Sequence, residues 1–131
     1  DGVCDVNIAN LVKFHKEHGK IATLTAVILE QAKGVLDIAE DSTVKSFREK
    51  SALDGAPINA GYMVLEPEIF NYIPGDDTVF EREPLEAVAA QGELMSYMHK
   101  GYWQCMDTQR EKELLERLWS KGVAPWKKWT D

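Results

Sequence analysis

The sequence lacks the features that mark secreted, membrane-spanning or nucleic-acid-binding proteins. It has two cysteines in 131 residues, Cys4 and Cys105, which lie far apart and fit no zinc-binding spacing. We expect both to be reduced thiols in a cytoplasmic protein. No apolar run approaches the roughly 20 residues that a membrane helix needs, and no amino-terminal stretch has the pattern of a signal peptide. The net charge of −7 argues against nucleic acid as the main partner, because a phosphate backbone attracts a basic surface.

The sequence also lacks the common motifs of nucleophilic catalysis. Neither GxSxG nor CxxC occurs, and the three histidines fit no metal-binding or catalytic-triad spacing. We expect His15 to be half-buried on a helix and His18 and His99 to lie at the surface.

The composition and the order of apolar segments are those of an α/β protein. Hydrophobic residues make up 44% and charged residues 28%, which is ordinary for a globular chain. Helical spacing runs from about Asn7 to His18, with Asp5 as the expected cap and Gly19 as the stop. The short apolar run Ile21–Leu29 follows and is typical of a buried strand in a parallel sheet. A helix followed by a buried strand indicates an α/β fold.

The rest of the chain predicts further short elements. They are a hairpin of Gly34–Ile38 and Val44–Phe47, strands at Ile58–Leu65, Leu94–Met98 and Tyr102–Trp103, a short helix opened by Pro67, and helices at Pro84–Gly92 and Thr108–Lys121. The last helix carries an apolar stripe of Leu114, Leu115, Leu118 and Trp119. No internal repeat or linker is visible, so we expect a single domain, or one part of a domain, over residues 1–131.

Two pairs of polar residues are candidates for binding phosphate or metal. Asp1-Gly2 places a carboxylate beside a flexible backbone, which suits Mg²⁺ next to a phosphate. A turn is the commoner explanation of that pair in isolation. In Glu49-Lys50, the lysine can meet a phosphate as a point charge and the glutamate can accept sugar hydroxyls. The alternative is a solvated surface pair.

Other candidates lie within or at the ends of the expected strands. Asparagine is depleted in strand interiors, so Asn59 is expected to have a polar role. Gly61 is expected to leave room for a ligand or another backbone. Asp107 or Thr108 is the expected cap of the last helix, and Asp107, where a strand meets that helix, could cap it and also face a metal. Glu81 and Glu83 precede a helix, whose dipole they complement.

Seven segments occur in one order: DGVCDVN, FREK, DGAPINAGYMVL, DDTVFEREPL, QGEL, GYWQCMDT and LERLWSKGVAPWKKW. In that order they resemble the glucose-1-phosphate cytidylyltransferases, which make CDP-glucose and are sugar nucleotidyltransferases. The match runs essentially from Asp1 to the end. It implies the carboxyl-terminal half of a nucleotide-diphospho-sugar transferase fold, with a mixed, mostly parallel sheet flanked by helices.

The resemblance also implies roles for single residues. Asp1 matches the metal-binding aspartate of the family's GDG motif, and Asp107 matches the second one, in MDT, so Mg²⁺ is the implied cofactor. Lys50, with Glu49 beside it, matches the family's EKP motif near the sugar phosphate. Asn59 matches the asparagine of INGG that meets the glucose. The implied set is Asp1, Asp107 and Lys50 as catalytic residues, with Glu49, Asn59, Gly61 and Glu83 as substrate-binding residues.

The chain departs from this family in ways that affect the expected function. The glycine-rich GGxGTR-like loop is absent from the sequence, EKP reads EKS, and INGG reads INAG. We therefore expect the carboxyl-terminal part of a cytidylyltransferase-like protein, with glucose 1-phosphate and CTP as partners and no activity by itself. We expect it to form a homo-oligomer or to associate with a missing amino-terminal half, and we expect Mg²⁺ binding by this chain to be weak.

Two alternatives remain open at this point. One is a stand-alone, non-catalytic module that binds a sugar phosphate or forms oligomers, and the other is an inert fragment. The nucleobase also remains open, because dTTP or ATP could replace CTP.

Overall fold

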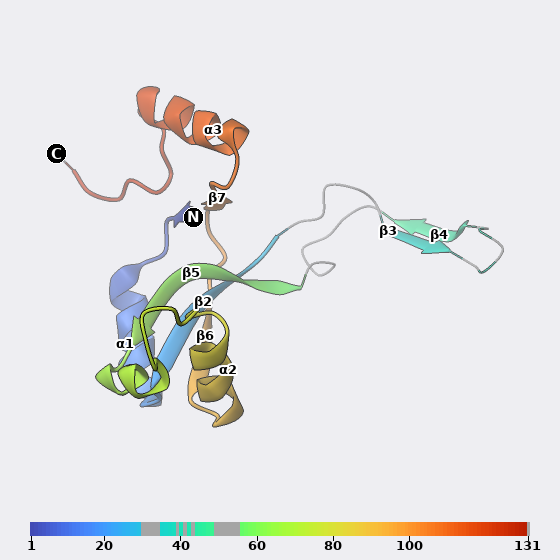
Figure 1. Ribbon diagram of the computed structural model, residues 1–131. Helices are drawn as coiled ribbons and strands as arrows, with labels where there is room; N and C mark the ends of the chain where they lie inside the picture. The colour runs from blue at the N-terminus through green and yellow to red at the C-terminus, as the bar shows by residue number, and fades with distance from the viewer. Residues whose placement is uncertain (30–34, 39, 41, 43, 49–55, 131) are drawn as a thin grey trace.

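The centre of the protein is a three-stranded sheet in the order β5–β2–β6 (Figure 1). The structure, a computed structural model, describes residues 1–29, 35–38, 40, 42, 44–48 and 56–130. β2 (Ala22–Ile28) lies between β5 (Pro57–Leu65), which is antiparallel to it, and β6 (Leu94–Met98), which is parallel to it. This mixed sheet and its flanking helices confirm the α/β class expected from the sequence.

The remaining described elements lie before, between and after these three strands. They are β1 (Gly2–Cys4), α1 (Ile8–His18), β3 (Val35–Ile38), β4 (Val44–Arg48), a 3₁₀-helix at Pro67–Tyr72, α2 (Glu83–Ala90), β7 (Trp103–Cys105) and α3 (Gln109–Ser120). In the described part of the chain, no helix combines the length and the apolar character needed to cross a membrane.

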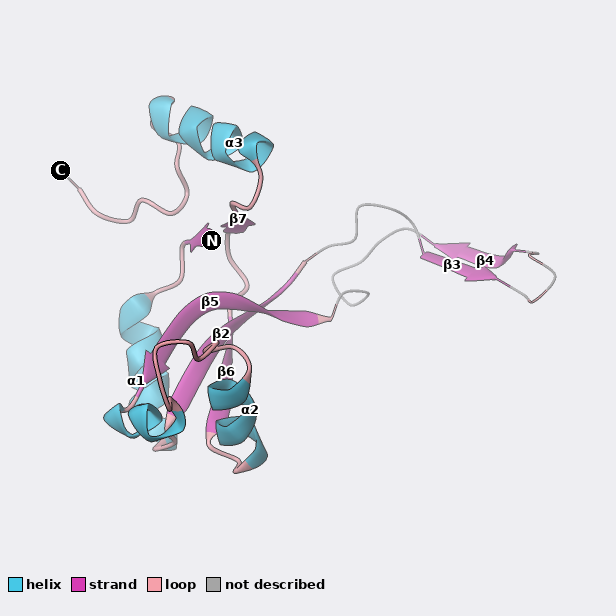
Figure 2. Ribbon diagram, in the orientation of Figure 1, coloured by secondary structure: helices cyan, strands magenta, loops and turns pink. Residues whose placement is uncertain are grey.

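The helices α1 and α2 cover opposite faces of the three-stranded sheet (Figure 2). Neighbouring residues of a strand point to opposite faces. On one face, Thr23 contacts His15 of α1. On the other face, Ala22 packs with Leu85 and Val88 of α2. The central strand β2 is therefore largely buried from both sides, as the nearly continuous apolar pattern of Ile21–Leu29 predicted.

Two smaller antiparallel ladders complete the structure. β3 and β4 form the expected hairpin, which extends away from the three-stranded sheet in Figure 1. β1 pairs with β7, so that Gly2 is opposite Cys105 and Cys4 is opposite Trp103. The sequence did not predict β1, because three residues are too short to show an alternating pattern. This ladder joins the beginning of the chain to the segment before α3.

The start of α1 differs from the expectation. Asn7, and not Asp5, caps the helix, because Oδ1 of Asn7 accepts a hydrogen bond from the backbone N–H of Asn10 at 3.0 Å. Asp5 instead accepts from the backbone N–H of Tyr102 at 2.8 Å, and its Oδ1 lies 2.8 Å from Nε2 of His99. The expectation of a surface His99 was wrong, since only 10% of its side chain is exposed. Asp5 therefore holds the β6–β7 connection against the start of the chain.

A buried polar network joins α1 to β2. His15 is almost fully buried, with Nδ1 2.7 Å from Oγ1 of Thr23 and Nε2 2.7 Å from Oε1 of Glu66. Nε2 of His18 contacts the same Thr23 hydroxyl, and Nδ1 of His18 accepts from the backbone N–H of Lys20 at 2.9 Å. A ring nitrogen that accepts a hydrogen bond carries no proton, so this network requires neutral His18.

The last helix, α3, is stabilised at its amino-terminal end. Thr108 and Glu111 form a capping box, in which each side chain accepts from the other residue's backbone N–H. Among Gln109–Ser120, all of which the structure describes, no side chain is fully buried. Trp119 is 50% exposed and stacks on Trp126 with ring centroids 6.5 Å apart. The expected apolar stripe therefore lies on a partly exposed surface next to the carboxyl-terminal tail.

We expect acidification to destabilise the protein through His18. Burial, followed by the charges of His15 and Lys20, lowers the pKa of His18 in the folded state. The neutral imidazole therefore stabilises the fold fully above its unfolded-state pKa of about 6.5, and this contribution is lost as the pH falls through the lower folded-state pKa. The thermal midpoint of unfolding should decrease as the pH is lowered from about 7.5 to about 5. The fall should be smaller in His18→Gln, and equal falls in the two proteins would contradict the assignment.

Candidate functional site

One cavity gathers residues from four separate segments of the chain. Its volume is about 570 Å³, which is in the range of small-ligand sites. β1, β5, β7 and the turn before α2 contribute its walls. The lining residues are Asp1, Gly2, Asn59, Ala60, Gly61, Tyr62, Glu81, Trp103, Cys105 and Asp107. Four of the residues singled out from the sequence, Asp1, Asn59, Gly61 and Asp107, thus lie around one cavity.

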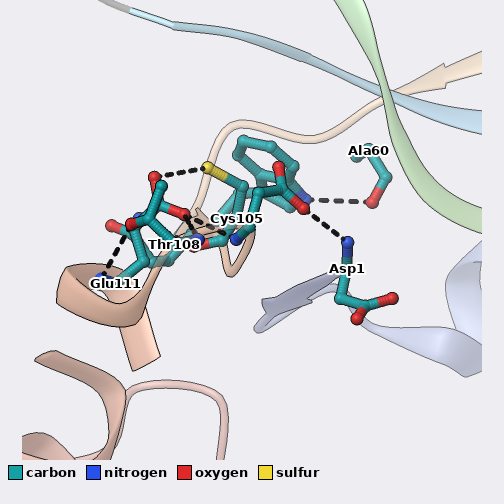
Figure 3. Close-up of polar contacts among 8 residues, drawn as sticks. Asp1, Ala60, Cys105, Thr108 and Glu111 are labelled. Atoms are coloured by element: carbon teal, nitrogen blue, oxygen red, sulfur yellow. Dashed lines mark hydrogen bonds and ion pairs between the residues drawn. The ribbon is translucent and has the colours of Figure 1, made fainter. Parts of the chain in front are cut away.

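The β1–β7 ladder places Asp1 beside Asp107. The backbone N–H of Met106 donates to the carbonyl of Asp1 at 2.8 Å, which extends the pairing by one residue. The amino group of Asp1 lies 3.0 Å from Oδ1 of Asp107. Figure 3 shows the carboxylate of Asp1 extending away from that contact. The side chains of Asp1 and Asp107 are 86% and 67% exposed, so rotation of the Asp1 side chain toward a shared ligand meets little obstruction.

The lining side chains that carry a charge near neutral pH are all acidic. Asp1, Glu81 and Asp107 supply carboxylates, and no lysine, arginine or histidine is among the lining residues that the structure describes. An anionic ligand would therefore be repelled unless a cation lay between it and these groups. Hard carboxylate oxygens are the ligands that Mg²⁺ prefers in proteins, so the donor set fits this ion. Mg²⁺ itself stays a prediction.

A second group of ligand-type atoms at α3 is explained by helix capping. The side chains of Cys105, Asp107 and Glu111 place one such atom each within 4.8 Å of the others. Figure 3 shows that Glu111 already accepts from the thiol of Cys105, at 3.4 Å, and it also accepts from the backbone N–H of Asp107. This backbone hydrogen bond lowers the pKa of Glu111. Burial and the neighbouring Glu111 raise the pKa of Cys105, which keeps its sulfur a neutral thiol and disfavours metal binding.

Part of β5 bulges where it meets the cavity. Leu24 of β2 is opposite Met63, whereas Ala26 is opposite Asn59, so β5 carries extra residues between these pairs. Gly61 lies in this bulge with φ of 91°, and its N–H donates to Oδ1 of Asn59 at 2.9 Å. Bulges often redirect side chains next to functional sites. The bulge therefore turns the Asn59–Gly61 segment toward the cavity.

The structure adds a backbone reason for glycine at position 61. The sequence suggested that this glycine leaves space for a ligand or a backbone. A Cβ atom added there would meet nothing within 4 Å, and room for a ligand stays a prediction. The positive φ is a separate constraint, because residues with a Cβ atom rarely adopt it. The polar role expected for Asn59 is in part the hydrogen bond that supports this conformation.

Three sequence candidates remain to be placed. Glu49 and Lys50 lie outside the described residues. Glu83 is in the first turn of α2 and lines a separate hollow with Asp77 and Arg82. Glu81 lines the cavity instead.

The sequence analysis missed Glu81, Tyr62 and Trp103 as lining residues. Each lies within four residues of a candidate that was recognised: Glu83, Asn59 or Asp107. Their proximity in sequence was a usable signal, but only the folded chain shows which of them face the cavity.

Comparison with known proteins identifies relatives over the whole chain. The sequence profile of the nucleotidyl transferase family matches residues 1–130. Glucose-1-phosphate cytidylyltransferases of Salmonella typhi and Salmonella typhimurium are each 52% identical over 129 residues, which cover 98% of this chain and 50% of the relative. A solved structure from Bacillus anthracis, described as a glucose-1-phosphate thymidylyltransferase, matches with a TM-score of 0.62 at 14% identity. It covers 100% of this chain and 54% of that one, and at this identity it supports the fold alone.

We expect Gly61→Ala to destabilise the protein. The substitution places a Cβ atom on a residue with positive φ, which costs about 1–2 kcal/mol. Gly75→Ala is the matched control, because Gly75 is not among the glycines with positive φ. Urea unfolding of the two variants measures the difference. Equal unfolding midpoints would contradict the conformational explanation.

Proposed function

The chain belongs to the nucleotidyl transferase family, and we propose that it forms the sugar-phosphate-binding and metal-binding part of a glucose-1-phosphate cytidylyltransferase. Such an enzyme joins CTP and glucose 1-phosphate into CDP-glucose and releases pyrophosphate. The chain spans about half the length of the curated relatives it matches. The proposal therefore concerns what residues 1–131, taken as one domain, contribute to the site.

The observation that carries the proposal is the cavity itself. It brings the carboxylates of Asp1 and Asp107, from the β1–β7 ladder, next to the polar bulge of Asn59 and Gly61 on β5. The chemistry requires both parts, because a sugar phosphate has a neutral polyhydroxyl ring and an anionic group. Carboxylates without a cation would repel the phosphate, whereas carboxylates holding Mg²⁺ suit it.

Asn59 is suited to contact the sugar ring. Its Oδ1 is used by the N–H of Gly61, which fixes the orientation of the side-chain amide. The NH₂ group of that amide retains donors for a sugar hydroxyl. Because the bulge holds Asn59 in place before the ligand arrives, less conformational entropy is lost on binding.

The acidic residues, through Mg²⁺, and Lys50 would together neutralise the negative charge of the phosphates. The reaction brings two anions together, so catalysis consists mainly of positioning and charge neutralisation. Asp1 and Asp107 would hold Mg²⁺, and this ion, when bound, offsets the charge of the phosphates. Glu49 and Lys50 keep their expected roles beside the sugar phosphate as part of this proposal.

The triphosphate cradle has to come from outside residues 1–131. The GGxGTR-like loop that binds the nucleotide in this family is absent from the sequence. We therefore propose that these residues bind the sugar phosphate but do not transfer a cytidylyl group without an amino-terminal half.

A second candidate function is a non-catalytic module that associates with itself or a partner. Within the described residues, β5 pairs with β2 alone, so no strand covers its other edge. Trp119 and Trp129 are each about half exposed near the carboxyl terminus. A stable oligomer without any sugar-phosphate binding would favour this second function over the first.

We expect glucose 1-phosphate to bind the chain in the presence of Mg²⁺. Asn59→Asp keeps the acceptor for Gly61 but removes the NH₂ donors. The affinity for glucose 1-phosphate should therefore fall about two- to tenfold. Asn10→Asp on α1, which is exposed and outside the cavity, adds the same charge elsewhere and should leave affinity unchanged. Calorimetric titration measures the three affinities. Equal affinities would remove Asn59 from the site.

We expect Asp107→Asn to abolish the Mg²⁺ dependence of that binding. The substitution removes a charged metal ligand and preserves the size of the side chain. Asp76→Asn, at an exposed position in the turn before α2, is the control.

A second assay mixes the chain with CTP, Mg²⁺ and glucose 1-phosphate. Pyrophosphate release at an enzyme-like rate would contradict the proposal that an amino-terminal half is required.

A further inference from the structure

We propose that Trp103 is a positioning residue that sets the spacing between the two parts of the cavity, the carboxylates on the β1–β7 ladder and the bulge of β5. The inference rests on the proposed function for its two ligands, Mg²⁺ and glucose 1-phosphate. It goes further by assigning the coupling between those ligands to one indole ring, which contacts neither the metal nor the sugar in this assignment.

The first observation is a hydrogen bond from Trp103 into the bulge. Its Nε1–H donates to the carbonyl of Ala60 at 2.9 Å, and Figure 3 draws this bond to the labelled Ala60. Ala60 is 3% exposed and has no opposite residue in the β2–β5 register. The bulge therefore removes Ala60 from the ladder, and the indole supplies a donor for its carbonyl.

The second observation is the contact of the same ring with β1. A Cβ atom added to Gly2 would lie 3.2 Å from Nε1 and 3.4 Å from Cε2 of Trp103. The ring is thus seated directly against the backbone next to Asp1. Since Trp103 itself belongs to β7, this residue links three strands: its own, β1 through Gly2, and β5 through Ala60.

The β1–β7 ladder and the three-stranded sheet are separate sheets, so contacts such as these set their spacing. A further contact joins them, in which the backbone N–H of Cys4 donates to the hydroxyl of Tyr62 at 3.3 Å. The hydrogen bond from Trp103 is shorter, at 2.9 Å, and its acceptor residue, Ala60, lies between Asn59 and Gly61 in the sequence. Because the ring is rigid, it transmits the position of the carboxylates to the bulge. A phosphate that contacts the metal and a sugar ring that contacts Asn59 would then bind together more tightly than either alone.

The experiment compares wild type with Trp103→Phe, which keeps a ring and removes the N–H donor. Calorimetry measures the dissociation constant of glucose 1-phosphate without Mg²⁺ and at saturating Mg²⁺. In wild type we expect Mg²⁺ to tighten binding about tenfold, a typical coupling between two sites. In Trp103→Phe the ratio should approach one, while binding of each ligand alone changes little. Trp129→Phe in the tail is the matched control and should keep the wild-type ratio.

A readout without ligand separates this inference from the proposed function. The amide of Gly61 is held by Asn59 inside the bulge, so its NMR signal should shift and its hydrogen exchange should accelerate in Trp103→Phe. Signals from α1 and α2 should be unchanged, which shows that the fold persists. Gly2→Ala, which displaces the ring from the β1 side, should produce the same local changes if Trp103→Phe does not fold.

Each outcome decides the inference. An unchanged Gly61 amide or an unchanged Mg²⁺ ratio in a folded Trp103→Phe protein would overturn the positioning role while leaving the proposed function intact. If wild type binds neither ligand, the proposed function fails, and the coupling assigned to Trp103 fails with it. A lost ratio together with a shifted Gly61 amide supports the inference.

Discussion

The first five residues of the chain are held against residues 102–106 by backbone pairing, and the cavity depends on that pairing. β1 and β7 contribute three residues each, which is short for a ladder. Side chains reinforce it: Asp5 accepts from the N–H of Tyr102 and contacts His99. Asp1 and Asp107 are 106 positions apart in the sequence, and without these contacts nothing would hold them close in space. With these contacts, their backbones are neighbours, and the acidic side of the cavity exists.

The two ends of the central strand β2 have different surroundings. One end is packed between helices, and the other end lies near the cavity. Around Ala22 and Thr23, the two helices cover both faces of the sheet, with an apolar cluster on one side and the histidine network on the other. Around Ala26, the pairing with β5 shifts register and the bulge opens onto the cavity. Regular packing at one end thus supports irregular backbone at the other. This arrangement suits a binding site, because polar backbone groups can be exposed there without weakening the core.

Two acidic residues near the start of α3, Asp107 and Glu111, have different roles. Glu111 caps the helix and accepts from the N–H of Asp107, which commits it to structure. Asp107 is exposed at the same junction and has its carboxylate outside the capping box. Two acidic residues four positions apart therefore have different environments. Of the three ligand-type side chains at this point, Asp107 alone keeps its carboxylate outside the hydrogen bonds of the helix cap, and its Oδ1 instead lies 3.0 Å from the amino group of Asp1.

The sequence by itself determined the elements whose signal is local. The apolar run of β2, the hairpin of β3 and β4, and the caps at Gly19 and Thr108 were readable because each depends on residues that are close in the chain. The order of the motifs was enough to indicate the family. The grouping of Asp1, Asn59 and Asp107 in one site was inferred from resemblance, since no local pattern links such distant positions.

Only the tertiary structure decided how these elements meet. Asp5 was misread as a cap because a short aspartate before a helix commonly caps it, and its partner Tyr102 is 97 residues away. The positive φ of Gly61 was not foreseen, because a φ angle has no signature in composition. Trp103 was passed over because its importance depends on three strands coming together. Contacts between distant segments depend on the whole fold, and a single sequence records them only indirectly.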